Sequence, residues 1–347
     1  MQINEIRWQS PSNIALIKYW GKKDFQLPMN PSLSVTLSNS VTNTNLIYHK
    51  KEYADREVSF EFYFDGSRNL TFECKIRNWL ESVLPLFSFL NDYEIKVDSG
   101  NSFPHSSGIA SSASSFAGLA LCLCSMEIEV TSKMSGFDSF EQKASYAARL
   151  GSGSASRSVL GDFAVWGKNN LVSRSSDEYA VPLDFTVHDS FNDLHDSILV
   201  VSSEEKRISS SKGHRLMLTN PYAEFRYKVA DLNFNKLIDA LKTGNTVAFI
   251  NVVENEALNL QAMFLTSQPG FILARPGTIE IINKIREFRD KTGLFLCFTL
   301  DAGPNVHLLY PGKIQAEIHE FIKTELLQYC EDGFWIDDKI GKGPERK

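Results

Sequence analysis

The chain has 347 residues, of which 43% are hydrophobic, and its formal net charge at pH 7 is −6. This length allows one large or two medium domains, and the acidic balance argues against a general nucleic-acid-binding surface. The first ten residues, MQINEIRWQS, contain no apolar signal-peptide core, and no apolar run approaches membrane-spanning length, so we expect a cytoplasmic protein. The five cysteines lack partners at zinc spacing, which predicts reduced core thiols at Cys122, Cys124 and Cys297.

The first half of the chain reads mainly as strands. Alternating or β-branched runs predict strands at residues 32–49, 58–64 and 93–99, and a further strand-like run, NIALIKYWGK, carries Lys18. A helix is predicted at residues 74–90, with an interruption at Pro85. Another is expected to begin near Asp138, since Asp138 and Glu141 have the spacing of a capping box, and to stop at Gly151.

Between these helices lies the most informative segment, SFPHSSGIASSASSFA at residues 102–117. Its Ser, Gly and Ala residues have little apolar volume to bury, but they can present backbone N–H groups and hydroxyls at a helix N-terminus, which favours a bound anion. A flexible Ser-rich linker is the alternative. The apolar helix that follows directly, predicted to continue to about Cys124, favours the phosphate site.

The second half is more helical. After a glycine-serine turn, a short helix and a strand (GSGSASRSVLGDFAVW), another strand is predicted at residues 197–203. Helices are predicted at residues 222–242, 246–264, 278–291 and 314–329. The run LFLCFTLDAGPNVHLLY predicts a hairpin with Asp301 at its turn. This alternation favours an α+β fold with two lobes, at residues 1–188 and 189–347.

Four segments in this order resemble the diphosphomevalonate decarboxylase family of the GHMP kinase superfamily. SPSNIALIKYWGKKD with LPMNPSLSVTL (residues 10–24 and 27–37) is similar to the amino-terminal signature of the family, and FPHSSGIASSAS (103–114) to the superfamily phosphate loop. GSGSASRS (151–158) resembles the segment with a catalytic arginine, and DAGPNVH (301–307) the segment with a catalytic aspartate. No Walker motif, nucleophile elbow or H-E-x-x-H motif competes with this interpretation.

The resemblance implies a two-lobed GHMP kinase fold, with an N-terminal lobe like the second domain of a ribosomal protein and a ferredoxin-like C-terminal lobe. It implies ATP and Mg²⁺ as cofactors, mevalonate 5-diphosphate as substrate, isopentenyl diphosphate, CO2, ADP and phosphate as products, and a homodimer. Neither a nucleic acid nor a membrane is expected as a partner. Two departures stand out: His105, Ser106 and Ser107 occupy variable loop positions, and His214 replaces the methionine of a family S-S-x-x-G-M segment.

The chemistry explains why three residues are the best catalytic candidates. A 3-hydroxy acid without a β-carbonyl has no electron sink, so its hydroxyl must become a leaving group, here by phosphorylation. Asp301 is suited to orient or deprotonate that hydroxyl, and Lys18 to keep Asp301 ionised. Arg157 offers a planar fork for phosphate or carboxylate. Without the resemblance, the alternatives are a turn aspartate, a lysine reaching out from an edge strand and a solvated arginine.

The resemblance also assigns the binding residues. Those predicted to hold the substrate are Asn13, Tyr19, Lys22, Ser152, Gly153, Ser154 and Arg157. Those predicted to surround the ATP phosphates are Ser106, Ser107, Gly108, Ser111 and Ser112. Asn13 is also expected to support Lys18, whereas His105 and His307 are expected to be satisfied structural histidines, and no metal ligand is assigned.

Two rival functions remain open. A GHMP small-molecule kinase, such as a mevalonate or phosphomevalonate kinase, would phosphorylate and stop, but such kinases typically carry a glycine cluster where this chain has Asp-Ala-Gly-Pro-Asn. A catalytically silent nucleotide sensor would be expected to lack some of Asp301, Lys18 and Arg157, and all three are present.

Overall fold

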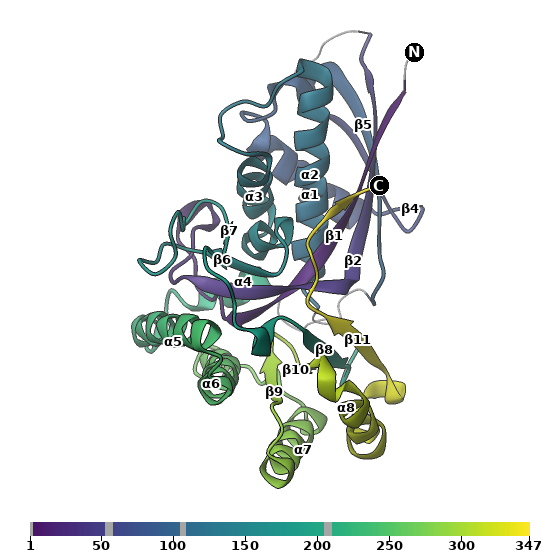
Figure 1. Cartoon of the computed structure of the whole chain (residues 1–347). Helices are drawn as coiled ribbons and strands as arrows, with labels where there is room; N and C mark the ends of the chain where they lie inside the picture. Colours follow the sequence, from purple (N-terminus) through teal and green to yellow (C-terminus); the bar gives the residue numbers. More distant parts are fainter. Residues whose placement is uncertain (1–2, 53–57, 105–108, 205–209) are drawn as a thin grey trace.

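The computed structural model describes residues 3–52, 58–104, 109–204 and 210–347. Four of the residues that the sequence predicts at the phosphate loop, His105, Ser106, Ser107 and Gly108, lie outside these ranges. Within them, the chain forms two β-sheets, and helices pack against both (Figure 1). This arrangement confirms the predicted α+β fold.

The larger sheet is built on two long antiparallel strands, β1 (Asn4–Ile17) and β2 (Ser32–Lys50). In the described part of the chain it has eight strands, with the order β12-β1-β2-β5-β3-β4, and β6 and β7 continue from β2. The other bounds are β3 (Ser59–Phe64), β4 (Ser67–Arg68), β5 (Tyr93–Asn101), β6 (Phe163–Trp166), β7 (Val181–Pro182) and β12 (Glu345–Arg346). The β1–β2 register shifts between Pro11 and Asn13 and again between Ala15 and Ile17, just before Lys18.

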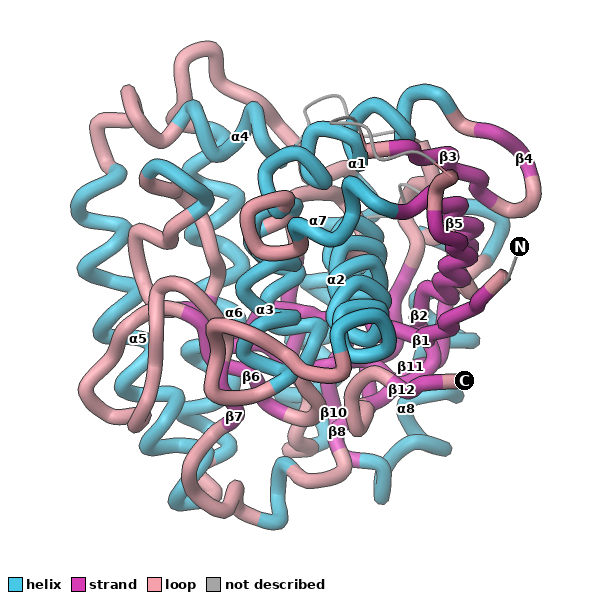
Figure 2. The backbone as a smooth tube through the Cα atoms, turned by 90° about the horizontal axis from the view of Figure 1, so that it is seen from above, coloured by secondary structure: helices cyan, strands magenta, loops and turns pink. Residues whose placement is uncertain are grey.

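Three helices cover one face of this sheet: α1 (Leu70–Val83), α2 (Ser111–Thr131) and α3 (Phe140–Gly151). Figure 2 shows α2 end-on, between α3 and the strands β1 and β2. In length and hydropathy α2 could cross a membrane, which contradicts the expectation that no apolar run approaches that length. In the fold, however, 72% of its apolar window is buried, so α2 serves as a core helix.

The smaller sheet has the order β11-β8-β10-β9 among the described residues and is antiparallel. Its strands are β8 (Leu194–Leu199), β9 (Cys297–Leu300), β10 (Val306–Pro311) and β11 (Trp335–Lys339). The helices of the second half of the chain are α4 (Ser210–Leu216), α5 (Ala223–Thr243), α6 (Thr246–Leu265), α7 (Pro276–Thr292) and α8 (Gln315–Phe321). The predicted hairpin is confirmed, because β9 pairs with β10 and Asp301 directly follows β9.

The two sheets are tied together at several points. One hydrophobic cluster contains residues of β1, β2 and β6 together with residues of α5, α6 and β8. The carboxylate of Asp338, on β11, accepts hydrogen bonds from the backbone N–H groups of Ser38, Asn39 and Ser40 on β2. The last strand, β12, returns to pair with β1. The division of the chain at residues 188 and 189 stays a prediction.

Local differences from the predicted elements have physical reasons. Helix α3 is capped by Ser139, whose hydroxyl accepts from the N–H of Gln142, so the capping box at Asp138 and Glu141 is wrong. Helix α2 runs seven residues beyond Cys124 because its later residues are also buried against the sheet. The strand β1 begins well before the apolar run, since a bulge accommodates Pro11. The sequence did not predict α4, β11 or β12.

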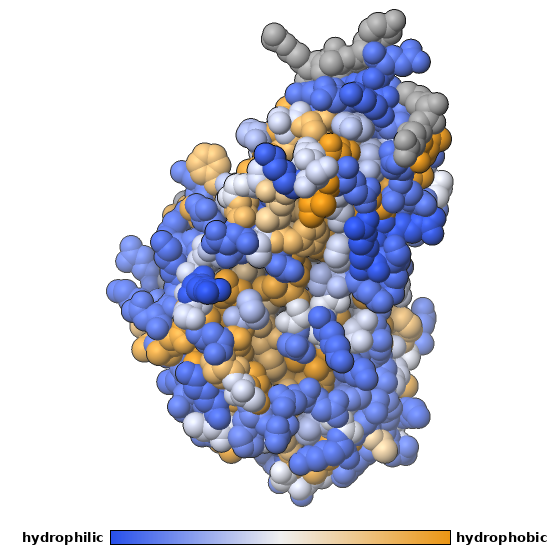
Figure 3. All heavy atoms as spheres, turned by 45° about the horizontal axis from the view of Figure 1, so that its top comes forward, coloured by the Kyte–Doolittle hydropathy of each residue, from blue (hydrophilic) through white to orange (hydrophobic). Residues whose placement is uncertain are grey.

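The cysteines behave as predicted. Cys122, Cys124 and Cys297 are free and buried, and burial raises the pKa of each thiol. On the face drawn in Figure 3, hydrophilic side chains predominate and apolar ones gather towards the middle.

Candidate active site

Lys18 lies directly after the end of β1 and is only 1% exposed, so it is not an edge-strand lysine reaching into solvent. Its Nζ donates to the carbonyl of Ala15 at 2.6 Å, and its own carbonyl accepts from Asn30 Nδ2 at 3.1 Å. Burial lowers the pKa of Lys18 to about 8, while the negative charge of Asp301 opposes that shift. Lys18 is therefore a buried amine with a main-chain partner, in the field of the Asp301 carboxylate.

Arg157 lies in the 3-10 segment Gly153–Val159, which follows the glycine-serine turn in the chain, and its side chain is buried, with the residue 2% exposed. Its guanidinium group donates to Ser34 Oγ at 3.0 Å, to Ser32 Oγ at 2.5 Å and to Asn13 Oδ1 at 3.4 Å. Burial lowers the pKa of Arg157 to about 10, and Tyr19 and Asp301 oppose the shift. The group is therefore a buried and oriented cation, not a solvated helix arginine.

Asn13 contacts Arg157 and the segment that follows the glycine-serine turn. Its Nδ2 donates to Ser158 Oγ at 2.8 Å and to the Ser154 carbonyl at 3.2 Å, while its Oδ1 accepts from Arg157. These contacts orient Arg157 and the glycine-serine turn. The predicted support of Lys18 by Asn13 stays a prediction.

Asp301 lies in the loop between β9 and β10 and is partly exposed, in contrast to the two buried cations. Its charge raises the pKa of Lys18 and that of Arg157, each against the effect of burial. The three residues are 139 or more positions apart in the sequence, yet they interact electrostatically in the fold. The structure thus groups one accessible carboxylate with two desolvated cations.

Tyr19 and Gly153 pack against each other beside Arg157. A Cβ on Gly153 would lie 2.7 Å from the hydroxyl of Tyr19 and 2.8 Å from the ring of Trp166, so only glycine allows this approach. The rings of Tyr19 and Trp166 are 4.6 Å apart. The Tyr19 hydroxyl is buried without a hydrogen-bond partner, which is unusual for a native polar group and leaves it able to bind a ligand atom.

Lys22 and His214 lie close to this group. Lys22 Nζ donates to Gln26 Oε1 at 2.8 Å, and burial together with Arg215 lowers its pKa. His214, on α4, is 7% exposed and packs on both Tyr19 and Trp20, with ring centroids 4.4 Å from each. The residue that departs from the family pattern is therefore in contact with a predicted substrate residue.

Serine hydroxyls connect the two predicted anion sites. Ser112 Oγ lies 3.3 Å from Ser152 Oγ, which lies 3.3 Å from Ser154 Oγ. Ser111 and Ser112 begin α2, whose N-cap residue, Ala110, has φ 45° and offers no capping side chain. The N-cap residue of α2 therefore supplies no side-chain acceptor to the first N–H groups, an arrangement suited to an anion at a helix N-terminus.

Sequence reasoning missed three buried polar residues in this region. Glu256 and Gln261, both on α6, hydrogen-bond to Lys18 and to the Asp301 loop. Asp196, on β8, is 1% exposed and bonds His307 Nδ1 at 2.7 Å, which confirms His307 as a satisfied strand residue. The only available signal was a pair of glutamates inside an apolar helical run at residues 246–264.

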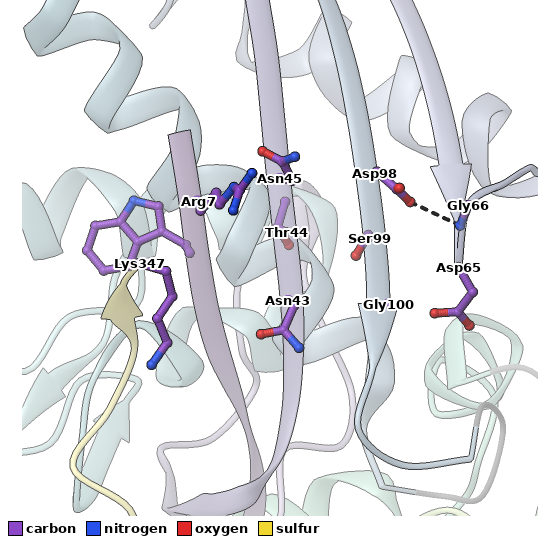
Figure 4. Close-up of a pocket in the computed structure, with 11 residues that line it drawn as sticks. Arg7, Asn43, Thr44, Asn45, Asp65, Gly66, Asp98, Ser99, Gly100 and Lys347 are labelled. Atoms are coloured by element: carbon purple, nitrogen blue, oxygen red, sulfur yellow. Dashed lines mark hydrogen bonds between the residues drawn. The ribbon is translucent and has the colours of Figure 1, made fainter. Parts of the chain in front are cut away.

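A surface hollow of about 410 Å³ lies elsewhere, on the large sheet (Figure 4). Residues of β1, β2 and β5, among them Trp8, line it together with Asp65, Gly66 and Lys347, and Asp98 Oδ1 accepts from the N–H of Gly66 at 3.3 Å. None of the predicted site residues lines it, so it is separate from the candidate active site.

The described residues include no preformed metal site of the kind that His, Cys, Asp and Glu build. In the described ranges, no group of three or more His, Cys, Asp or Glu side chains could hold an ion. Mg²⁺ commonly retains waters and binds through one or two carboxylates plus the phosphates of its substrate. The residues present fit an ion that arrives with a nucleotide.

Comparisons with known proteins agree with this site. Residues 10–180 match the model of the diphosphomevalonate decarboxylase-like N-terminal domain, and residues 197–337 that of the mevalonate 5-diphosphate decarboxylase C-terminal domain. The diphosphomevalonate decarboxylase of Ganoderma lucidum is 33% identical over 340 residues, covering 93% of this chain and 82% of that protein.

Solved structures of similar proteins superpose on this chain over its full length. Mevalonate diphosphate decarboxylase from Staphylococcus aureus has a TM-score of 0.83 and 30% identity, covering 100% of this chain and 98% of that one. A structure described as MDDEF in complex with MVAPP, AMPPCP and magnesium has a TM-score of 0.83 and 27% identity, covering 100% and 99%. The resemblance read from the sequence is confirmed, and this chain belongs to the diphosphomevalonate decarboxylase family.

Proposed function

We propose that this chain catalyses the ATP-dependent decarboxylation of mevalonate 5-diphosphate to isopentenyl diphosphate, with release of ADP, phosphate and CO2. The observation that carries the proposal is the electrostatic grouping of Asp301 with the buried cations Lys18 and Arg157. Relatives that cover most of the chain are named for this activity, and a similar structure holds MVAPP, AMPPCP and magnesium.

The proposed reaction begins at the C3 hydroxyl of the substrate. Asp301 accepts its proton as the oxygen attacks the γ-phosphoryl group of ATP, and ADP leaves. The C3–O bond then breaks and phosphate takes the bonding electrons, so positive charge develops at C3. The bond between C2 and the carboxylate carbon breaks next, its electrons form the alkene, and CO2 is released.

Lys18 and Arg157 have separate tasks in this scheme. Lys18 stabilises the ionised form of Asp301, and the planar guanidinium group of Arg157, oriented by Ser32, Ser34 and Asn13, binds anionic oxygens of the substrate. Because these hydrogen bonds already fix the Arg157 side chain, little side-chain entropy is lost when substrate binds. The other substrate-binding residues proposed are Tyr19, Lys22, Ser152, Gly153 and Ser154.

The ATP phosphates bind at the start of α2, near Ser111 and Ser112, in this proposal. The uncapped N–H groups and the adjacent serine hydroxyls support it. The remaining predicted members of this site are Ser106, Ser107 and Gly108. Mg²⁺ would be held mainly by phosphate oxygens and water, where it neutralises charge on the transferred group.

The decisive experiment measures ADP and CO2 together when the purified chain is incubated with ATP, Mg²⁺ and mevalonate 5-diphosphate. We expect the two products in equal amounts. Release should be much slower with mevalonate itself, because mevalonate lacks the diphosphate group and cannot make its binding contacts. ADP without CO2 would support the alternative of a GHMP small-molecule kinase. A cytoplasmic location and a homodimer stay predictions.

A further inference from the structure

Side chains of helix α6 hydrogen-bond to the two segments that carry Lys18 and Asp301. The Oε2 atom of Glu256 accepts from the backbone N–H of Lys18 at 2.9 Å. The Nε2 atom of Gln261 donates to the carbonyl of Asp301 at 3.2 Å and to that of Gly303 at 3.5 Å. Both side chains are buried, at 0% and 8% exposure, so neither contact competes with bulk water.

These contacts satisfy main-chain groups outside the strand ladders. The pairing of β1 with β2 ends at Ile17, so the N–H of Lys18 has no strand partner and takes a carboxylate instead. Asp301 and Gly303 lie between β9 and β10, beyond the last ladder pair of Leu300 with Val306. At both places the chain leaves a sheet, and side chains of α6 bond to main-chain groups that the strand ladders do not pair.

The carboxylate of Glu256 is itself held rigidly. Its Oε2 also accepts from Arg226 Nη2 at 2.7 Å, and its Oε1 accepts from Asn233 Nδ2 at 2.8 Å. Both partners lie on α5, and Arg226 is 2% exposed. Both oxygens are therefore occupied, and charge-assisted hydrogen bonds of this kind are short and directional.

We propose that Glu256 and Gln261 are positioning residues for decarboxylation, and that α6 sets the separation of Lys18 and Asp301 by holding the main chain of each. This inference rests on the proposed function. Glu256 and Gln261 act through the residues they hold.

Glu256 also acts on Lys18 through its charge. The charged groups that influence Lys18 come from four elements: Asp301 from the hairpin loop, Glu256 from α6, Arg157 from the 3-10 segment and Asp196 from β8. Arg226, from α5, offsets part of the Glu256 charge. The negative charge of Glu256 raises the pKa of Lys18, against the effect of burial. Removing that charge should make Lys18 lose its proton at lower pH.

The test compares Glu256→Gln, Glu256→Asp and Gln261→Leu with the control Glu254→Gln. Glu254 is also on α6, is 6% exposed and pairs with arginines, but its partners are Arg286 and Arg289 on α7. Each protein is assayed for kcat, for KM of both substrates and for the pH dependence of kcat/KM, and its urea midpoint is measured in parallel.

We expect kcat to fall roughly 10- to 100-fold in the three test variants, with KM changed little, because small misplacements of reacting groups reduce the rate by such factors. In Glu256→Gln the alkaline limb of kcat/KM should also move to lower pH, by roughly half to one unit. Glu256→Asp keeps the charge, so its limb should stay near that of the wild type while kcat falls. Glu254→Gln should keep wild-type kcat and an unshifted profile, even if its urea midpoint drops.

A purely structural role for the two residues predicts another outcome. Activity would then follow the urea midpoint in all four variants, with no shift of the alkaline limb, and this result would overturn the proposal. The products released by the wild-type chain distinguish the positioning role from the proposed function. A wild-type chain that releases ADP but no CO2 overturns the decarboxylase function. If the wild type decarboxylates and the Glu256 and Gln261 variants have the same kinetics as the wild type, only the positioning role is overturned.

Discussion

The imidazole ring of His214 accepts a hydrogen bond from the backbone N–H of Gly21 through Nδ1, at 3.0 Å. Because Nδ1 is the acceptor, the proton of the neutral ring is assigned to Nε2. Burial, and secondarily the charge of Lys22, lowers the pKa of His214 to about 3, so the ring is neutral at physiological pH. The histidine thus connects α4 to the segment that carries Tyr19 and Lys22 without adding charge.

Replacing His214 by methionine should weaken substrate binding without abolishing turnover. Methionine can fill the space between Tyr19 and Trp20, but it leaves the N–H of Gly21 without its acceptor. One neutral hydrogen bond is worth about 0.5–1.5 kcal/mol, so KM for mevalonate 5-diphosphate should rise about 2- to 10-fold. Steady-state kinetics test this, with His319→Met on α8 as the control.

The same variant tests the protonation state of His214. Since the ring does not titrate near neutral pH, the profile of kcat/KM between pH 5 and 8 should have the same shape in wild type and His214→Met. An acidic limb near pH 6 that disappears in the variant would contradict the neutral assignment.

The alkaline dependence of activity should report Lys18. Its cationic form stabilises the Asp301 carboxylate, and its pKa is about 8, so kcat/KM should fall above about pH 8. Lys18→Arg should remove this limb, because arginine stays protonated. An identical limb in Lys18→Arg would mean that another group titrates.

The contribution of Lys18 to the stability of the free enzyme should rise with pH, whereas activity falls. The folded-state pKa of about 8 lies below the ordinary value of 10.5, so between these two pH values the unfolded chain binds more protons than the folded chain. The contribution of Lys18 to stability therefore rises with pH across this window. Urea midpoints at pH 8 and 10, compared with those of Lys18→Met, measure this contribution and show whether alkaline inactivation is unfolding.

Asp301→Asn should nearly abolish turnover while both substrates still bind. The amide is close in shape but cannot accept the hydroxyl proton, so we expect a loss of roughly 10²–10⁴-fold in kcat. Calorimetric binding of both substrates tests the second half of the prediction. Asp290→Asn, at an exposed position on α7, is the control and should remain active.

The double variant Asp301→Asn/Lys18→Met tests whether the two residues work together. Residues that act as one unit are non-additive, so the double variant should lose much less than the product of the single losses. Fully multiplicative losses would show that Lys18 and Asp301 act independently.

Arg157→Lys should not restore function, even though it keeps a positive charge. The guanidinium group uses separate nitrogens for Ser34, Ser32 and Asn13, an arrangement that a single ammonium group cannot reproduce. We expect kcat/KM to fall by at least about tenfold, whereas Arg289→Lys on α7 should be nearly silent. Wild-type kinetics in Arg157→Lys would mean that only diffuse charge is needed at this position.

Much of the architecture could be predicted from local patterns. The predicted helices at residues 222–242, 246–264 and 278–291 match α5, α6 and α7 to within two residues, because each has a regular apolar face. The hairpin at Asp301 was predictable from turn chemistry. The strand containing Pro11 and the short helix α4 were not, because bulge geometry and tertiary packing override local propensity there.

The sequence by itself determined the family and named Lys18, Arg157 and Asp301, because short segments of unusual composition carry that information in order along the chain. Only the tertiary structure decided how these residues are held. Glu256 contacts Lys18 across 238 positions and Gln261 contacts Asp301 across 40, and no local pattern specifies such partners. The depressed pKa values of Lys18 and His214 likewise depend on burial, which arises only when distant elements exclude water from the same place.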